Sequence, residues 1–148
     1  MSDISITELK KLCLKALTNA GLAENDADIT VDHYLENELS GKTSHGLVRV
    51  VQAVGFIKQN GIAKSSPAIA LDKNNIVVID GKMNIAPVLG KAVLEEAITR
   101  AQDHGLAMVG GNNYFGNTGS MAYYLKRLAD KNLIAFISCN SVACVAAP

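Results

Sequence analysis

Apolar residues recur at helical spacing over the first third of the chain, which predicts three helices. The first helix has a clear start, because Ser5 and Glu8 are placed as a capping box. An apolar stripe then runs from Leu9 to Ala20, and Gly21 is placed to end the helix as its C-terminal cap. These signals predict a helix that begins just after Ser5 and ends before Gly21.

The second apolar stripe predicts a helix from about 24 to 40, which Gly41 ends. The residues expected to face inward on it are Ala27, Val31, Tyr34, Leu35 and Leu39. His33 lies on the same helix between charged neighbours, so we expect it at a solvated surface position rather than in a catalytic site.

The third apolar stripe, from Leu47 to Ile57, follows a serine that is a good N-cap. With Ser44 at the cap, His45 takes the first helical position and Arg49 lies one turn above it on the same face. The free amides of a helix N-terminus favour an anion, a guanidinium adds a bidentate fork, and an imidazole exchanges a proton near neutral pH. The pattern fits a binding site for the carboxylate of a 2-oxo or 2-hydroxy acid. Local spacing alone also fits the more common case of a capping serine before a solvated His and Arg.

After Gly61 the pattern changes to strands that alternate with helices. A polar stretch over 64–67 leads to a β-rich run over 68–71, and a turn followed by a strand over 76–80 predicts a hairpin. The later elements are expected in this order: a helix over 87–103, a strand over 106–109, a helix over 119–131 and a strand over 133–138. Such alternation predicts crossover units. We therefore expect an α/β protein with a helical segment over 1–63 and a mixed α/β unit over 64–148.

Composition excludes function classes without identifying one. The 14 Lys and Arg residues balance the 14 Asp and Glu residues, so the chain has no basic surface for nucleic acid. Its three cysteines lack metal-ligand spacing, which predicts no metal site and favours reduced thiols in a cytoplasmic protein. Polar residues precede the first apolar run, and Asn140 breaks the apolar stretch that starts at Leu133, so we expect neither a secretory signal nor a membrane span.

The predicted loop over 110–119 is a second candidate site. A loop that leaves the carboxyl end of a strand and enters a helix is where α/β proteins collect ligands. Its glycines allow a ligand to approach the backbone closely, but their spacing is not G-x-G-x-x-G. The sequence therefore does not predict a Rossmann phosphate site.

Several of these motifs together resemble the malate/L-lactate dehydrogenase family, whose nicotinamide-dependent members do not use the Rossmann fold. The resemblance rests on Ser44-His45-Gly46 with Arg49 and on the segments 61–62, 101–109, 112–115 and 133–148, which occur in the family's order. It implies a fold of the sulfolactate dehydrogenase-like type and hydride transfer between NAD or NADP and a small 2-oxo or 2-hydroxy acid. It also implies a homodimer.

The resemblance implies a role for individual residues. His45 is expected to exchange the proton, while Ser44 and Arg49 bind the substrate. Tyr114 stands where many members have a histidine, so we expect it either to donate a proton or simply to pack at the base of the loop. Ala53 stands where members often have a tyrosine, which indicates a remodelled site. The residues expected to bind the cofactor are Asn113, Asn140 and Ser141.

The resemblance ends at Pro148, about halfway along a typical family member, so we expect much of the nucleotide pocket to be missing. Three interpretations stay open: part of a dehydrogenase, a truncated product that still binds ligand, and a non-enzymatic oligomerising module. In each case an incomplete sheet and an apolar C-terminal run predict that the chain associates.

Overall fold

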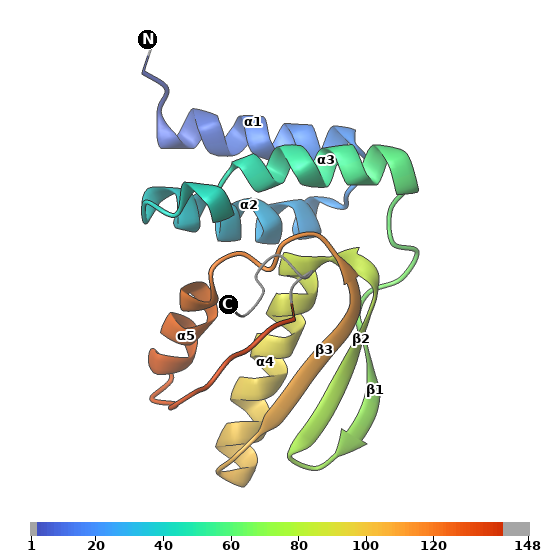
Figure 1. Ribbon diagram of the computed structural model, residues 1–148, viewed down its shortest axis with the longest axis vertical. Helices are drawn as coiled ribbons and strands as arrows, with labels where there is room; N and C mark the ends of the chain where they lie inside the picture. Colours follow the sequence, from blue (N-terminus) through green and yellow to red (C-terminus); the bar gives the residue numbers. More distant parts are fainter. Residues whose placement is uncertain (1–2, 141–148) are drawn as a thin grey trace, which may run out of the picture.

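The computed structural model describes residues 3–140 of the chain. The helical segment consists of α1 (Ile6–Asn19), α2 (Glu24–Leu39), the short 3-10 turn η1 (Thr43–His45) and α3 (Val48–Asn60). The α/β unit that follows consists of β1 (Ala68–Lys73), β2 (Ile76–Ile85), α4 (Ala86–His104), β3 (Met108–Phe115) and α5 (Met121–Ala129). Figure 1 shows α1 to α3 as a layer above the α/β unit, where α4 lies between the sheet and α5. The predicted order of three helices and a mixed α/β unit is confirmed.

The capping box at the start of α1 forms as predicted, and local signals also mark both ends of α4. The Ser5 hydroxyl accepts from the Glu8 amide at 3.2 Å, and the Glu8 carboxylate accepts from the Ser5 amide at 3.1 Å. The Ser5 hydroxyl also donates to the Glu8 carboxylate at 2.6 Å, and this hydrogen bond together with the one from the Ser5 amide lowers the pKa of Glu8. In α4, Pro87 stands in the first turn, where its missing N–H has no helical partner, and Gly105 ends the helix with φ of 77°.

The third helix begins later than predicted. Ser44 lies inside η1 and is not the N-cap of α3, which starts at Val48 after Leu47. The cause lies on α2, because the Glu38 carboxylate accepts from the Leu47 amide at 2.8 Å and so replaces the serine hydroxyl. His45 therefore precedes the helix rather than occupying its first position.

The sheet has the order β1-β2-β3, with an antiparallel β1/β2 hairpin and a parallel β2/β3 pair joined through α4. Its last two strands extend beyond their predicted ends, so residues 110–115 belong to a strand and not to a loop. The cause is that β2 continues to Ile85 and pairs with β3 as far as Phe115. Ladder hydrogen bonds with this partner outweigh the weak strand preference of the glycines.

The predicted strand over 133–138 is wrong. The Leu133 amide still bonds to the Leu128 carbonyl at 3.1 Å, but residues 133–140 belong to no helix or strand. The Ile134 and Phe136 side chains are almost fully exposed, at 105% and 92%. Apolar alternation makes a strand only where the segment hydrogen-bonds to a strand edge, and among the described residues β3 pairs with β2 while residues 133–138 pair with no strand.

Two apolar clusters form the core of the described residues. The larger joins the three N-terminal helices to Ile85, Val88 and Phe115 of the α/β unit. The smaller lies between the sheet and α4, around Val77, Ile79 and Leu89. Because the first cluster spans both predicted segments, the boundary at residue 63 stays a prediction. Leu39, expected to face inward, is 60% exposed because it is the last residue of α2.

Within residues 3–140, no helix combines the length and the apolar character needed to cross a membrane. The same residues bring together no group of three or more His, Cys, Asp or Glu side chains suited to hold a metal ion.

Candidate active site

Polar side chains of α2 hold the turn that carries His45. The buried Asn37 donates from its amide to the His45 carbonyl at 3.2 Å, and Glu38 accepts from the Leu47 amide at 2.8 Å. Gly46 packs so closely on α2 that a Cβ there would lie 3.0 Å from the Glu38 Cα. A side chain at position 46 would therefore displace the turn, which explains the glycine of the Ser44-His45-Gly46 motif.

The structure brings Ser44, His45 and Arg49 together, although not through a helix N-cap. The Ser44 hydroxyl lies 2.9 Å from His45 Nδ1, and Arg49 Nε donates to the Ser44 carbonyl at 2.7 Å. Arg49 Nη1 donates to the Gln52 side chain at 2.7 Å. No hydrogen bond to His45 Nε2 or to Arg49 Nη2 is formed within residues 3–140, and no carboxylate in that range pairs with Arg49. The half-buried guanidinium therefore has a free donor and an uncompensated charge, which suits an anionic ligand.

A cavity of about 140 Å³ opens beside Arg49. Its lining comes from α2, α3, the ends of β2 and β3 and the loop after β3, and consists of Tyr34, Arg49, Gln52, Ala53, Phe56, Ile85, Phe115, Gly116 and Asn117. The Tyr34 hydroxyl donates to the Asn117 carbonyl at 2.6 Å, so α2 fixes the loop after β3 as well as the turn at His45. The His45 side chain is not part of this lining, and its turn is joined to the lining through the hydrogen bond from Arg49 Nε to the Ser44 carbonyl.

The other predicted site residues do not converge on this cavity. Successive side chains of a strand point to opposite faces, and Tyr114 joins the cluster under α4 while Phe115 joins the cluster of the N-terminal helices. The Asn113 side chain donates to Asp80 at 2.8 Å. Asn140 is exposed at the end of the described segment, and Ser141 lies outside the described residues.

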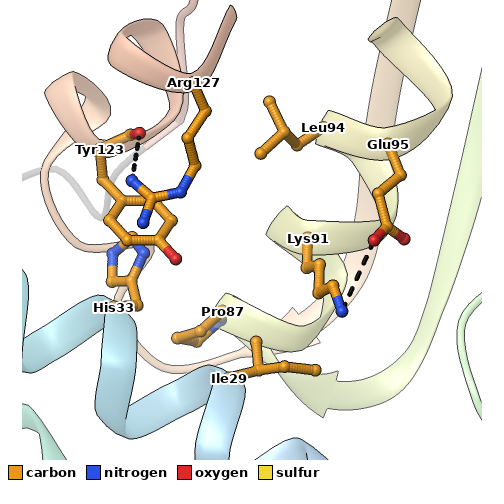
Figure 2. A pocket seen from close by; sticks show the side chains of 8 residues that line it. All are labelled: Ile29, His33, Pro87, Lys91, Leu94, Glu95, Tyr123 and Arg127. Atoms are coloured by element: carbon orange, nitrogen blue, oxygen red, sulfur yellow. Dashed lines mark hydrogen bonds and ion pairs between the residues drawn. The ribbon is translucent and has the colours of Figure 1, made fainter. Parts of the chain in front are cut away.

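The prediction that His33 is a solvated surface residue is wrong, because its side chain is 1% exposed. The ring centroids of His33 and Tyr123 lie 4.0 Å apart, and the Arg127 guanidinium carbon lies 3.4 Å from the centroid of the Tyr123 ring; Figure 2 shows the three side chains together. Neither ring nitrogen of His33 has a hydrogen-bond partner within the described structure. These residues line a second cavity, of about 230 Å³, between α2, α4 and α5.

His33 was missed because α2 contacts helices on both sides, with α1 and α3 on one side and α4 and α5 on the other. A helix that is buried on two faces shows little amphipathic contrast, so charged neighbours do not mark the solvent side. The available signal was the spacing of Thr30, His33 and Asn37, which places three polar residues on one face of the helix.

The stability of the chain should fall between pH 7 and pH 5 because of His33. Burial, with a smaller effect of the Arg127 charge, lowers the pKa of His33 from 6.5 to about 4. In this window the unfolded chain binds a proton that the native chain does not, so unfolding becomes easier as the pH falls. The expected loss is about 2 kcal/mol by pH 5, measured by urea denaturation.

His33→Gln should flatten this pH dependence, whereas His104→Gln, at an exposed residue of α4, should leave it unchanged. An equal loss of stability in wild type and His33→Gln would show that another group is responsible.

A sequence profile of the malate/L-lactate dehydrogenase family matches residues 4–148. L-sulfolactate dehydrogenase of Methanocaldococcus jannaschii is 33% identical over 142 residues, which cover 89% of this chain and 38% of that protein. Malate/(S)-sulfolactate dehydrogenase of Methanothermus fervidus is 32% identical over 147 residues, which cover 97% of this chain and 42% of that protein.

Among solved structures, malate dehydrogenase of Entamoeba histolytica superposes with a TM-score of 0.81 at 26% identity, over 88% of this chain and 36% of that one. The chain thus spans about 40% of the length of the curated relatives it matches.

Proposed function

This chain belongs to the malate/L-lactate dehydrogenase family, and on that basis we propose that it supplies the acid-binding part of an enzyme that interconverts 2-oxo and 2-hydroxy acids with NAD or NADP. The observation that carries the proposal is the half-buried Arg49 guanidinium, which lies beside a cavity and has no carboxylate partner within residues 3–140. A small organic acid supplies the missing charge.

In the proposed chemistry, Arg49 anchors the substrate carboxylate through its free donor while its Nε stays bonded to Ser44. His45 exchanges a proton with the substrate oxygen at C2, as general acid in the reduction and as general base in the oxidation. The Ser44 hydroxyl beside Nδ1 keeps the imidazole in a fixed orientation, with Nε2 free for the substrate.

The residues expected to bind the nicotinamide do not form a pocket within the described part of the chain. Asn113 is held by Asp80, and Asn140 lies exposed beyond the last helix. The choice of NAD or NADP as cofactor therefore rests on family membership alone, and we assign no step to it. A catalytic role for Tyr114 stays a prediction; its place in the cluster under α4 favours the packing role.

A second candidate function is acid binding without turnover by the 148-residue chain. It is favoured by the share of the relatives' length that the chain spans, about 40%, and by the unassembled cofactor residues. We expect the isolated chain to bind a 2-oxo acid and to show little or no oxidation of NADH or NADPH.

Binding of pyruvate to the chain tests the proposal directly. Followed by NMR, Arg49→Lys should weaken binding about tenfold, because the ammonium keeps the charge but loses the planar fork. Arg49→Gln should abolish binding. The matched control is Lys58→Gln, which removes one charge from an exposed residue of the same helix and should change nothing. If Arg49→Gln binds pyruvate as tightly as the wild-type chain does, Arg49 is not the carboxylate-binding residue.

We also propose that the chain forms homo-oligomers. Ile134 and Phe136 expose nearly their whole side chains, and Met108 on the sheet is 71% exposed. Sedimentation at tens of micromolar should show dimers or larger species, and the double substitution Ile134→Ser with Phe136→Ser should shift the chain towards monomer. Val51→Ser, at an exposed apolar residue of α3, should not. A monodisperse wild-type monomer would count against this assembly.

A further inference from the structure

The cavity beside Arg49 has a polar rim and an apolar interior. Its rim consists of the solvent-accessible residues Arg49, Gln52, Gly116 and Asn117. Its interior consists of aromatic or aliphatic side chains, from the buried Tyr34, Ala53, Ile85 and Phe115 and the half-buried Phe56. Of the described residues that line it, only Arg49 is charged. The cavity can therefore form an ion pair with a negatively charged group of a ligand at one end only.

The helix α3 lines this cavity from the charged end to the apolar end. Arg49, Ala53 and Phe56 are spaced at i, i+4 and i+7, so they follow one face of the helix. An acid whose carboxylate is held by Arg49 must pass over Ala53 to reach Phe56. The small side chain at position 53 leaves the room for it.

The interior offers no polar partner. The Phe56 and Phe115 rings are stacked, with centroids 3.7 Å apart and planes 13° from parallel. The Tyr34 hydroxyl is already used by the Asn117 carbonyl, so Tyr34 presents its ring. Among the described residues, the buried polar side-chain atoms without a partner belong to His33, which lines the other cavity.

The size of the cavity limits the side chain that it accepts. Its volume is about 140 Å³, and an apolar cavity of about 150 Å³ is large enough to hold benzene. A branched aliphatic group or a phenyl group fits this space. A second carboxylate or a sulfonate would lose its hydration there without gaining a counter-ion, which disfavours it.

We infer that this site selects 2-oxo or 2-hydroxy acids that carry a single acid group and a branched aliphatic or phenyl side chain, with Ala53 as the residue that determines specificity. The inference rests on the proposed function, because it takes Arg49 as the carboxylate anchor. It separates this chain from its relatives named for malate and sulfolactate, whose substrates carry two acid groups.

The test compares three acids by NMR titration of the 148-residue chain: 4-methyl-2-oxopentanoate, pyruvate and 2-oxoglutarate. Each fully buried methylene tightens binding about fourfold, so the branched acid, with three more carbons than pyruvate, should bind about 10 to 60 times more tightly, and the upper figure corresponds to complete burial. The dicarboxylate 2-oxoglutarate should bind no more tightly than pyruvate.

Ala53→Leu fills the space, so it should reduce the advantage of the branched acid over pyruvate to threefold or less while pyruvate affinity stays within threefold. The matched control is Val51→Leu, an exposed position on the same helix, which should keep the full advantage. If Ala53→Leu does not fold, Ala53→Gly replaces it and should raise the affinity for phenylpyruvate relative to 4-methyl-2-oxopentanoate.

The outcomes separate the two proposals. If none of the acids binds, Arg49 does not form a carboxylate-binding site, and the proposed function is overturned as well. If pyruvate binds but the branched acid gains nothing, or 2-oxoglutarate binds most tightly, only the inferred selectivity is overturned. A preference that neither Ala53 variant changes overturns the role of Ala53.

Discussion

Replacing His45 by Ala lowers turnover by about two to four powers of ten, the usual contribution of a positioned general acid or base. The assay requires a protein that carries residues 1–148 together with the further length that the relatives have. It measures the reduction of 4-methyl-2-oxopentanoate and pyruvate with NADH and with NADPH. The Michaelis constant should change little, because Arg49 and not His45 holds the carboxylate in the ground state.

Arg49→Lys in the same protein should have the opposite signature, with a raised Michaelis constant and a smaller loss of turnover. His104→Ala, at an exposed histidine of α4, serves as the control for removal of an imidazole. Full turnover in His45→Ala would move the proton-exchange role to Tyr114, which Tyr114→Phe then tests, or to a residue outside this chain.

Replacing Gly119 by Ala destabilises the fold by about 3 kcal/mol, from two separate causes. Gly119 has φ of 71°, where an L side chain costs about 1 kcal/mol. A Cβ there would also overlap the buried His33 ring and lie 2.9 Å from Asn37 Nδ2, and overpacking of this kind costs about 1 to 3 kcal/mol more. Urea denaturation measures the sum.

Gly105→Ala separates the two causes, because Gly105 has nearly the same backbone angle, with φ of 77°, and a Cβ added there would meet no atom within 4 Å. The free energy of unfolding of this control variant should fall by only about 1 kcal/mol. Equal losses for both variants would show that the contact with His33 contributes nothing to stability.

Local signals in the sequence were enough to predict α1, α2, α4 and the β1/β2 hairpin. A capping box, a proline in a first turn and a glycine after the last turn act within a few residues of themselves. Tertiary structure changes such predictions only when a distant group supplies a better partner. Glu38 is such a group, since it takes the amide that Ser44 was expected to cap.

The errors in the sheet have the same origin. Residues 110–115 form a strand because β2 extends alongside them, whereas residues 133–138 pair with no strand among the described residues. Strand formation depends on the availability of an edge, which a single segment does not encode.

In the candidate site, the Ser44-His45-Gly46 motif with Arg49 was recognisable from the sequence because its residues lie within two helical turns. The cavity and the burial of His33 were not, since both depend on α3, α4 and α5 meeting around α2. Ala53 was noticed as an unusual residue, and only its place in the lining gives that observation a physical meaning.

Tyr34 and Asn37 lie one turn apart on α2, and their hydrogen bonds hold segments that are more than 70 residues apart in the sequence, at Asn117 and His45. A local opening of this turn therefore releases both segments at once, so they should form one cooperative unit in native-state hydrogen exchange. The two sides of the candidate site are then coupled through the buried middle of α2, and a ligand that bridges Arg49 and the loop at Asn117 should slow exchange in both segments together.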